Sequence, residues 1–265
     1  MLVLNNIEVK YQNVILVLRG VTIEVPDGHV VSLLGANGAG KSTVIKAVSG
    51  MLYPEEGRVT DGSIEYNGVR IDGMRTTEIV NMGIVQVMEG RRTLEQLTTE
   101  ENLVAGAIGQ RPSRAELKKN LDRVYDLFPR LKDVRNQTAG YLSGGEQQQV
   151  VVGRGLMSQP KVMLLDEASL GLAPMLVKEI YNIIERLNKE EKISLLVVEQ
   201  NARAALAIAD YGYVMENGRV VLDDTGPKLI ENEDIKEFYM GLTQVGDKKS
   251  YKTIKHYKRR KRWLG

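Results

Sequence analysis

Residues 30–48 constrain the fold of this 265-residue chain more than any other stretch. A buried-strand pattern at 30–34 leads into a glycine-rich motif at 35–42, and an apolar periodicity then predicts a helix opening at Ser42. The motif fits G-x-x-x-x-G-K-[ST], in which backbone N–H groups turn toward a phosphate at the positive end of a helix. Lys41 can then reach the outer phosphates, and the Ser42 hydroxyl can hold Mg²⁺. We expect a nucleoside triphosphate site rather than a plain turn, because such a match arises by chance in roughly one chain in a hundred.

The composition, 43% hydrophobic and 26% charged, is typical of a globular protein with a buried core. We expect one large domain, or one domain with a lobe. No apolar run approaches the ~18 residues that span a bilayer, and the N-terminus lacks the basic start and cleavage site of a signal peptide. The chain has no cysteine, which excludes disulfides and thiolate metal sites and favours a cytosolic location.

The segments around the glycine-rich motif predict further strands. Alternating residues at 2–11 and 21–25 indicate half-buried strands, and 84–87 indicates another short strand. The glycine-rich segment 53–74 indicates a small antiparallel patch. Tyr11 could stack on a nucleotide base, but a partly buried core tyrosine explains it equally well on sequence alone.

Residues 91–157 have a helical character that suggests an inserted lobe. Ser113 and Glu116 form a capping-box pattern, and Pro129 is expected to close the helix that follows. Methionines such as Met157 and Met163 are ordinary core.

The segment 141–149 reads Y-L-S-G-G-E-Q-Q-Q and predicts a second helix start. Ser143 and Glu146 form its capping box, which places Gly144 and Gly145 on a helix N-terminus. This is again a geometry that binds anions.

The C-terminal half alternates strands with helices. An apolar strand at 161–166 ends in two carboxylates, Asp166 and Glu167. The expected elements after it are a helix at 176–190, a strand at 194–198, a helix at 201–210 and a hairpin at 213–221 announced by Asn217-Gly218. Such alternation predicts a mostly parallel sheet covered on both faces.

The glycine-rich motif, L-S-G-G-E-Q and the strand ending in Asp-Glu together resemble the ATP-binding cassette (ABC) ATPases over about residues 2–242. The S-G-G-E motif is the specific part, because other P-loop proteins lack it. V-M-E-G-R-R, D-E-A-S-L-G-L-A-P and V-V-E-Q-N-A resemble the ATPase subunits of branched-chain amino acid importers. The resemblance implies an α/β fold with a P-loop NTPase (RecA-like) core, a small antiparallel β subdomain and an inserted α-helical subdomain at about 89–157. A basic tail at 243–265 lies beyond the family pattern.

The resemblance also assigns the nucleotide contacts. Tyr11 becomes the aromatic that stacks on adenine, and Ser143, Gly144, Gly145 and Glu146 become the motif that binds the γ-phosphate held by the other subunit of a head-to-tail dimer. The phosphate cradle becomes Gly35, Ala36, Asn37, Gly38, Ala39, Gly40, Lys41, Ser42 and Thr43. Two helix N-termini facing one triphosphate supply the positioning and charge neutralisation that phosphoryl transfer needs.

The same resemblance assigns chemistry at the strand ends. Glu167 becomes the general base that orients the attacking water, with Lys41 and Gln200 contacting the γ-phosphate. Ser42 and Asp166 become metal-site residues for Mg²⁺.

Three positions depart from the commonest cassette pattern. Glu89 stands where most cassettes have a glutamine, and because a carboxylate beside a triphosphate needs an intervening cation, we expect Glu89 to lean toward Mg²⁺. Gln86 is the competing candidate, with poorer spacing. Gln200 replaces the switch histidine, and Ala173 replaces an aspartate that reaches across the dimer. The importer subclass shares these departures, so they do not indicate a dead enzyme.

The resemblance implies that the chain works with partner proteins. These are transmembrane permease subunits docking on the helical lobe, a second ATPase subunit, and an extracytoplasmic solute-binding protein acting indirectly. We therefore expect a protein peripheral on the cytoplasmic face of the inner membrane. Leucine, isoleucine and valine are the expected solutes, with urea, amides and aromatic acids left open.

Residues 247–265 carry nine Lys or Arg against one Asp. This tail could be a solvated extension that docks on the protein's own acidic body or on the permease. It could also contact anionic lipid, or, with its interleaved aromatics, nucleic acid.

A second hypothesis is a soluble ABC ATPase acting on the ribosome or on nucleic acid. That class usually has two cassettes in one chain or a long coiled-coil insertion, and this chain shows neither. A GTPase would need an N-K-x-D motif, which residues 188–191 do not form.

Overall fold

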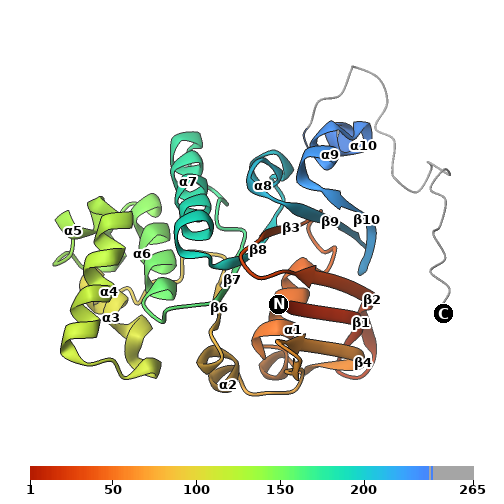
Figure 1. Ribbon diagram of the computed structural model, residues 1–265, viewed down its shortest axis with the longest axis horizontal. Helices are drawn as coiled ribbons and strands as arrows, with labels where there is room; N and C mark the ends of the chain where they lie inside the picture. Colours follow the sequence, from red (N-terminus) through yellow and green to blue (C-terminus); the bar gives the residue numbers. More distant parts are fainter. Residues whose placement is uncertain (239, 241–265) are drawn as a thin grey trace.

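The computed structural model describes residues 1–238 and 240, and it is built around a six-stranded sheet of order β10-β9-β3-β8-β7-β6 (Figure 1). Five of these strands run parallel, and β10 pairs antiparallel with β9 at one edge. The strands are β3 (Val30–Gly35), β6 (Ile84–Val87), β7 (Val162–Asp166), β8 (Ser194–Glu199), β9 (Tyr211–Glu216) and β10 (Arg219–Thr225). Every residue of β3, β7 and β8 is buried, as expected for inner strands of a parallel sheet covered on both faces.

A second sheet is antiparallel, with four strands in the order β2-β1-β4-β5. Its strands are β1 (Leu2–Tyr11), β2 (Ile15–Val25), β4 (Gly57–Tyr66) and β5 (Val69–Arg70). The antiparallel patch expected at 53–74 is therefore not a separate unit, because β4 pairs along the length of β1.

Ten α-helices and three short 3₁₀ helices complete the described part of the chain, and Figure 1 shows how the α-helices lie around the sheets. The α-helices are α1 (Lys41–Ser49), α2 (Thr76–Asn81), α3 (Thr99–Ala107), α4 (Arg114–Leu127), α5 (Pro129–Asp133), α6 (Gly144–Leu156), α7 (Pro174–Glu191), α8 (Ala202–Ile208), α9 (Gly226–Glu231) and α10 (Glu233–Phe238). Both predicted capping boxes are present: Ser113 and Ser143 each accept a hydrogen bond from the backbone N–H three residues on. Pro129 follows the end of α4 and also occupies the first turn of α5, where its missing N–H costs nothing.

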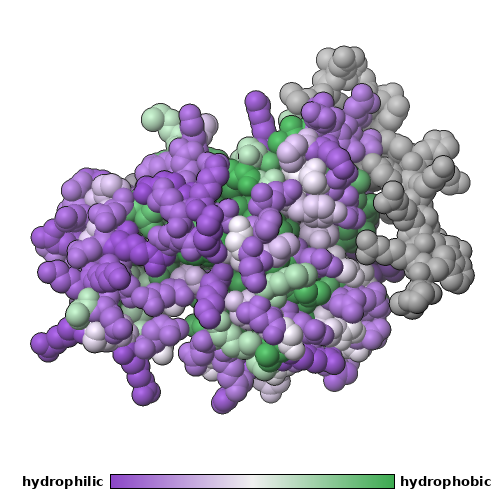
Figure 2. All heavy atoms as spheres, in the orientation of Figure 1, coloured by the Kyte–Doolittle hydropathy of each residue, from purple (hydrophilic) through white to green (hydrophobic). Residues whose placement is uncertain are grey.

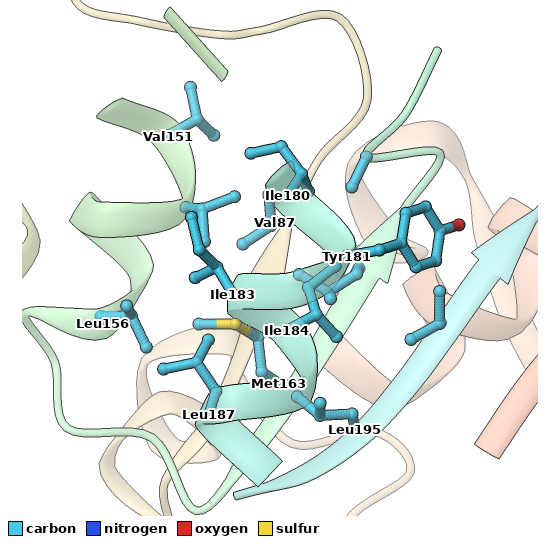
Figure 3. Close-up of a cluster of buried hydrophobic side chains, with 14 of the residues drawn as sticks. Val87, Val151, Leu156, Met163, Ile180, Tyr181, Ile183, Ile184, Leu187 and Leu195 are labelled. Atoms are coloured by element: carbon cyan, nitrogen blue, oxygen red, sulfur yellow. The ribbon is translucent and has the colours of Figure 1, made fainter. Parts of the chain in front are cut away.

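Two hydrophobic cores lie on opposite faces of the six-stranded sheet. One face packs against α1 and the antiparallel sheet, with Ile45 among its buried residues. The other face packs against α6 and α7. Figure 3 shows Ile183 and Leu187 of α7 gathered with Met163 of β7 and Leu156 of α6. The sheet therefore separates α1, which follows the glycine-rich motif, from α6, which follows L-S-G-G.

The surface of the face shown in Figure 2 is mostly hydrophilic, and hydrophobic side chains gather toward its middle. Within residues 1–238 and 240, no helix combines the length and the apolar character that a bilayer crossing requires. The basic tail expected at 243–265 lies outside the described residues.

Candidate functional site

The glycine-rich motif forms the turn between β3 and α1. Gly38 and Gly40 adopt φ values of 78° and 104°, a region that L side chains rarely occupy. A side chain at Gly38 would point into open space, whereas one at Gly40 would lie 2.9 Å from Leu18. The helix starts at Lys41, one residue before the predicted Ser42, with Gly40 as its N-cap. The open backbone at the N-terminus of α1 fits a bound phosphate.

Lys41 is buried and folds back over the turn. Its ammonium donates to the carbonyl oxygens of Gly35 at 2.8 Å and Ala36 at 3.3 Å. It also lies 3.4 Å from a carboxylate oxygen of Glu167. The predicted base and the predicted phosphate-binding cation are thus neighbours, although 126 positions separate them in the sequence.

Asp166 ends β7 and lies 3% exposed beneath the turn. The Ser42 hydroxyl donates to it at 3.4 Å. Burial raises the pKa of Asp166 to about 6, and the charges of Glu89 and Glu167 contribute to the rise, while Ser42 and Lys41 oppose it. The site therefore concentrates negative charge that a cation would relieve.

In the part of the chain that the structure describes, no three His, Cys, Asp or Glu side chains converge as a ready-made metal site. The pair of Ser42 and Asp166 still fits Mg²⁺, because this ion is usually held by one or two protein oxygens together with water and substrate phosphates. Glu89 is close enough to Asp166 to affect its pKa. Gln86 instead points its amide oxygen at the Ser49 hydroxyl, 2.6 Å away at the end of α1.

The ends of β7 and β8 bring two more expected residues together. These strands are adjacent and parallel, so Glu167 and Gln200 follow at the same edge of the sheet. Glu167 has a left-handed φ of 46°, and its N–H donates to Val198 at 2.9 Å. Gln200 is exposed immediately after β8. Ala173 lies further along, as the N-cap of α7.

A buried carboxylate next to Gln200 escaped the sequence analysis. Glu199 is 2% exposed and accepts hydrogen bonds from the Ser169 N–H at 3.1 Å and the Ser169 hydroxyl at 3.0 Å. Burial raises its pKa, and the bonds from Ser169 only partly offset this. The Tyr181 hydroxyl lies beside this carboxylate without regular hydrogen-bond geometry. The sequence does contain a signal for this residue, because it is an acidic residue at the end of an otherwise apolar strand.

The L-S-G-G-E motif opens α6. The Ser143 hydroxyl donates to the Glu146 carboxylate at 2.8 Å, and Arg130 donates to the same carboxylate at 2.7 Å. Partial burial raises the pKa of Glu146, but these hydrogen bonds lower it by more. A side chain at Gly145 would lie 2.5 Å from Leu176, so glycine is also needed for packing against α7. The helix that this motif opens packs on the other face of the sheet from α1.

Tyr11 is the last residue of β1 and is half-buried. It pairs with Gly57 of β4, where a side chain would lie 2.8 Å from the tyrosine ring. The ring therefore covers the glycine and packs on the core beneath it. Its stacking on adenine stays a prediction.

A parallel sheet with a glycine-rich phosphate turn after one strand, and an Asp-Glu pair after another, defines a P-loop nucleoside triphosphatase. The family model for ABC transporters matches residues 18–170. The chain is 45% identical to the high-affinity branched-chain amino acid transport ATP-binding protein BraG of Pseudomonas aeruginosa, over 87% of the chain and 96% of that protein. It is 31% identical to the probable branched-chain amino acid transport ATP-binding protein LivF of Archaeoglobus fulgidus, over 85% and 93% of the two chains.

The fold is similar to the ADP conformation of MJ1267, an ATP-binding cassette of an ABC transporter. The TM-score is 0.79 at 29% identity, covering 91% of this chain and 98% of that one. The chain belongs to the ABC transporter family, as an ATP-binding subunit that hydrolyses ATP. The predicted fold class is thereby confirmed.

Proposed function

We propose that this chain powers a membrane importer of branched-chain amino acids or related amides and hydrophobic solutes. The observation that carries the proposal is the 45% identity to the Pseudomonas transport subunit over nearly the full length of both chains. The similarity to LivF supports the same solute class. These relatives do not favour the alternative of a soluble ATPase acting on the ribosome or nucleic acid.

In this proposal the triphosphate of ATP lies on the turn at residues 35–43, and Tyr11 stacks on its base. Lys41 leaves Glu167 and turns toward the phosphates, which frees the Glu167 carboxylate to orient the attacking water and accept its proton. Gln200 donates its amide to the γ-phosphate. Mg²⁺, held through Ser42 and Asp166 with Glu89 nearby, supplies neutralising charge when it is bound.

A partner cassette completes the proposed ATP site. Ser143, Gly144 and Gly145, together with Glu146, serve the ATP of a second subunit, identical or different, in a head-to-tail dimer. The helix that they open packs on the other face of the sheet from α1, which supports a ligand held by a partner subunit. ATP then holds the two subunits together, and hydrolysis releases them.

We further propose that transmembrane permease subunits dock on the helical elements between residues 89 and 157. A cavity of about 270 Å³ between β6, α3 and α6 supports this placement; Met88, Arg92 and Gly106 are among its lining residues. A solute-binding protein outside the membrane would act through the permease. The chain would be peripheral on the cytoplasmic face of the inner membrane, and the positive charge of the tail sequence would attract anionic lipid.

The test is affinity purification of the full chain from detergent-solubilised membranes, followed by reconstitution of the complex in proteoliposomes. We expect a permease to co-purify, and we expect ATP hydrolysis to rise when a solute-binding protein loaded with leucine, isoleucine or valine is added. Lys41→Ala should abolish that hydrolysis while the complex still assembles. RNA retained in a salt-sensitive way, with no membrane partner, would overturn the proposal.

A further inference from the structure

Arg91 connects two loops at the proposed ATP-dependent surface. It lies between β6 and α3, two positions after Glu89. Its guanidinium donates to the carbonyl oxygens of Leu170 at 3.1 Å and Gly171 at 2.6 Å. Both carbonyls belong to residues 168–173, the segment between β7 and α7 that we call the 168–173 loop. Arg91 and Leu170 are 79 positions apart in the sequence, so this contact is a tertiary one.

The same guanidinium lies against the start of α6. A Cβ atom at Gly144 would lie 2.1 Å from one terminal nitrogen of Arg91, and a Cβ at Gly171 would lie 2.9 Å from the other. Gly171 also has a φ of 66°, which favours glycine independently. The planar side chain thus fills a space that two glycines leave open, between the L-S-G-G helix tip and the 168–173 loop.

The electrostatics of this position favour a specific role over a chance contact. A guanidinium stays charged at any physiological pH, and the N-terminus of a helix carries a partial positive charge, so the two repel. The carbonyl oxygens of Leu170 and Gly171 offset that repulsion. Arg91 itself has a φ of 51°, a conformation that costs a non-glycine residue free energy. Arg91 therefore keeps this position despite repulsion from the helix N-terminus and an unfavourable backbone conformation.

The 168–173 loop is fixed from its inner side as well. Glu199 binds the N–H and hydroxyl of Ser169, and the Leu170 N–H donates to the Glu167 carbonyl at 3.0 Å. Arg91 is the contact from the outer side that ties this loop to the segment carrying Glu89. Motion at Glu89 thus has a direct path to the loop that follows Glu167.

We propose that Arg91 is a positioning residue that couples the Glu89 segment, the first turn of α6 and the 168–173 loop, so that all three respond together when ATP binds. This inference rests on the proposed function in one respect, the placement of ATP on residues 35–43. Its consequence is that one chain presents its L-S-G-G tip and its 168–173 loop to a partner subunit as a single rigid edge. Arg91 acts through these segments and does not itself contact the nucleotide.

The test is hydrogen–deuterium exchange of the full chain with and without ATP, in a Glu167→Gln background that keeps ATP intact. The variants are Arg91→Ala and Arg91→Lys, and the matched control is Arg186→Ala at an exposed arginine of α7. The quantity compared is the ATP-induced change in exchange, not the basal rate, because a purely structural role would alter only the basal rate. Peptides covering 35–48 report ATP binding, and peptides covering 166–175 report the coupling.

We expect ATP to slow exchange in both peptides in the parent and in Arg186→Ala. In Arg91→Ala the 35–48 peptide should keep its protection, with an unchanged dissociation constant for ATP, while the ATP-induced slowing in 166–175 falls roughly tenfold. Arg91→Lys should be intermediate, because an ammonium keeps the charge without the planar fork. An equal ATP response of 166–175 in Arg91→Ala and Arg186→Ala, or no response in the parent, would overturn the inference. Absence of ATP protection at 35–48 in the parent would instead count against the proposed function.

Discussion

The Lys41 ammonium lies 3.4 Å from the Glu167 carboxylate, and both side chains are at least nine-tenths buried. The cation that we propose binds the phosphates is thus paired with the carboxylate that we propose orients the attacking water. In that mechanism ATP binding exchanges one charge partner of Lys41 for another, and the free-energy cost of breaking the buried pair lowers the affinity for ATP.

Glu167→Gln should slow ATP hydrolysis about 10²- to 10⁴-fold, because an amide is no general base. The same variant should bind ATP more tightly than the wild type, because Lys41 no longer has an anionic partner and one negative charge beside the triphosphate is gone. ATP-bound dimers should accumulate. Phosphate release and equilibrium titration with a fluorescent ATP analogue measure the two effects. Glu185→Gln, at a partly exposed position of α7, is the control. Wild-type turnover in Glu167→Gln would assign the base elsewhere.

Glu199→Gln tests the buried carboxylate beside Gln200 through the pH dependence of stability. The folded protein holds the proton of Glu199 more tightly than the unfolded chain, because burial raises its pKa above the ordinary 4.5. The free energy of unfolding of the wild type should therefore fall, relative to that of the variant, as the pH rises from the ordinary pKa of Glu199 through its raised pKa. Below the ordinary value the difference should no longer change with pH, since the acid is protonated in both states.

Urea unfolding of wild type and Glu199→Gln across pH 4–8 measures this difference, and the titration of groups that do not interact with Glu199 cancels in the comparison. The amide can still accept from the Ser169 N–H, so the variant should fold. A difference in the free energy of unfolding that does not change with pH would show that Glu199 is not the group responsible.

Gln200→His should add a step near pH ~6.5 to the rate of ATP hydrolysis, because imidazole titrates there and an amide does not. The wild type should lack a histidine-type step at saturating Mg²⁺ and ATP. His29 and His256 are the only histidines of the chain, so a variant lacking both is the control. A step near that pH that persists in this control would contradict the assignment of a non-titrating switch residue.

Gly106→Ala should destabilise the helical elements. A Cβ at Gly106 would lie 2.0 Å from the backbone oxygen of Arg154, so α3 and α6 cross there at backbone distance. Separating them should cost about 1–3 kcal/mol, more than the gain in helix propensity. Gly109→Ala is the matched control, since nothing lies within 4 Å of the position that its Cβ would occupy. Chemical denaturation measures both, and equal stability of the two variants would refute the crossing.

Local patterns predict most of the elements. Residues 2–11 and 84–87 form strands with the predicted bounds, because apolar alternation or a short buried run bounded by polar residues is a local signal. Strand β2 begins at Ile15, six residues before the predicted start, because β-bulges interrupt its alternation. From the sequence, Pro129 predicts the end of one helix. The structure shows that it also begins the next helix, because proline is favoured in a first helical turn.

The side-chain contacts of the site are not predictable in the same way. The phosphate turn is visible because its residues are adjacent in sequence. The pairs Lys41–Glu167, Ser169–Glu199 and Arg91–Gly171 join distant segments, and nothing in the local sequence specifies them. The sheet creates these contacts by bringing strand ends to one edge. The roles of Tyr11, Glu89 and Gln200 stay predictions.

The core on the α6 side of the sheet also has a mechanical consequence. Leu103 of α3, Val124 of α4 and Phe128 belong to the same buried cluster as Met163 and Leu195 of the strands. The helical elements therefore share one packed interior with the sheet. In the proposed transport cycle they should move by small sliding steps between interlocked side chains, and on heating they should unfold together with the rest of the domain.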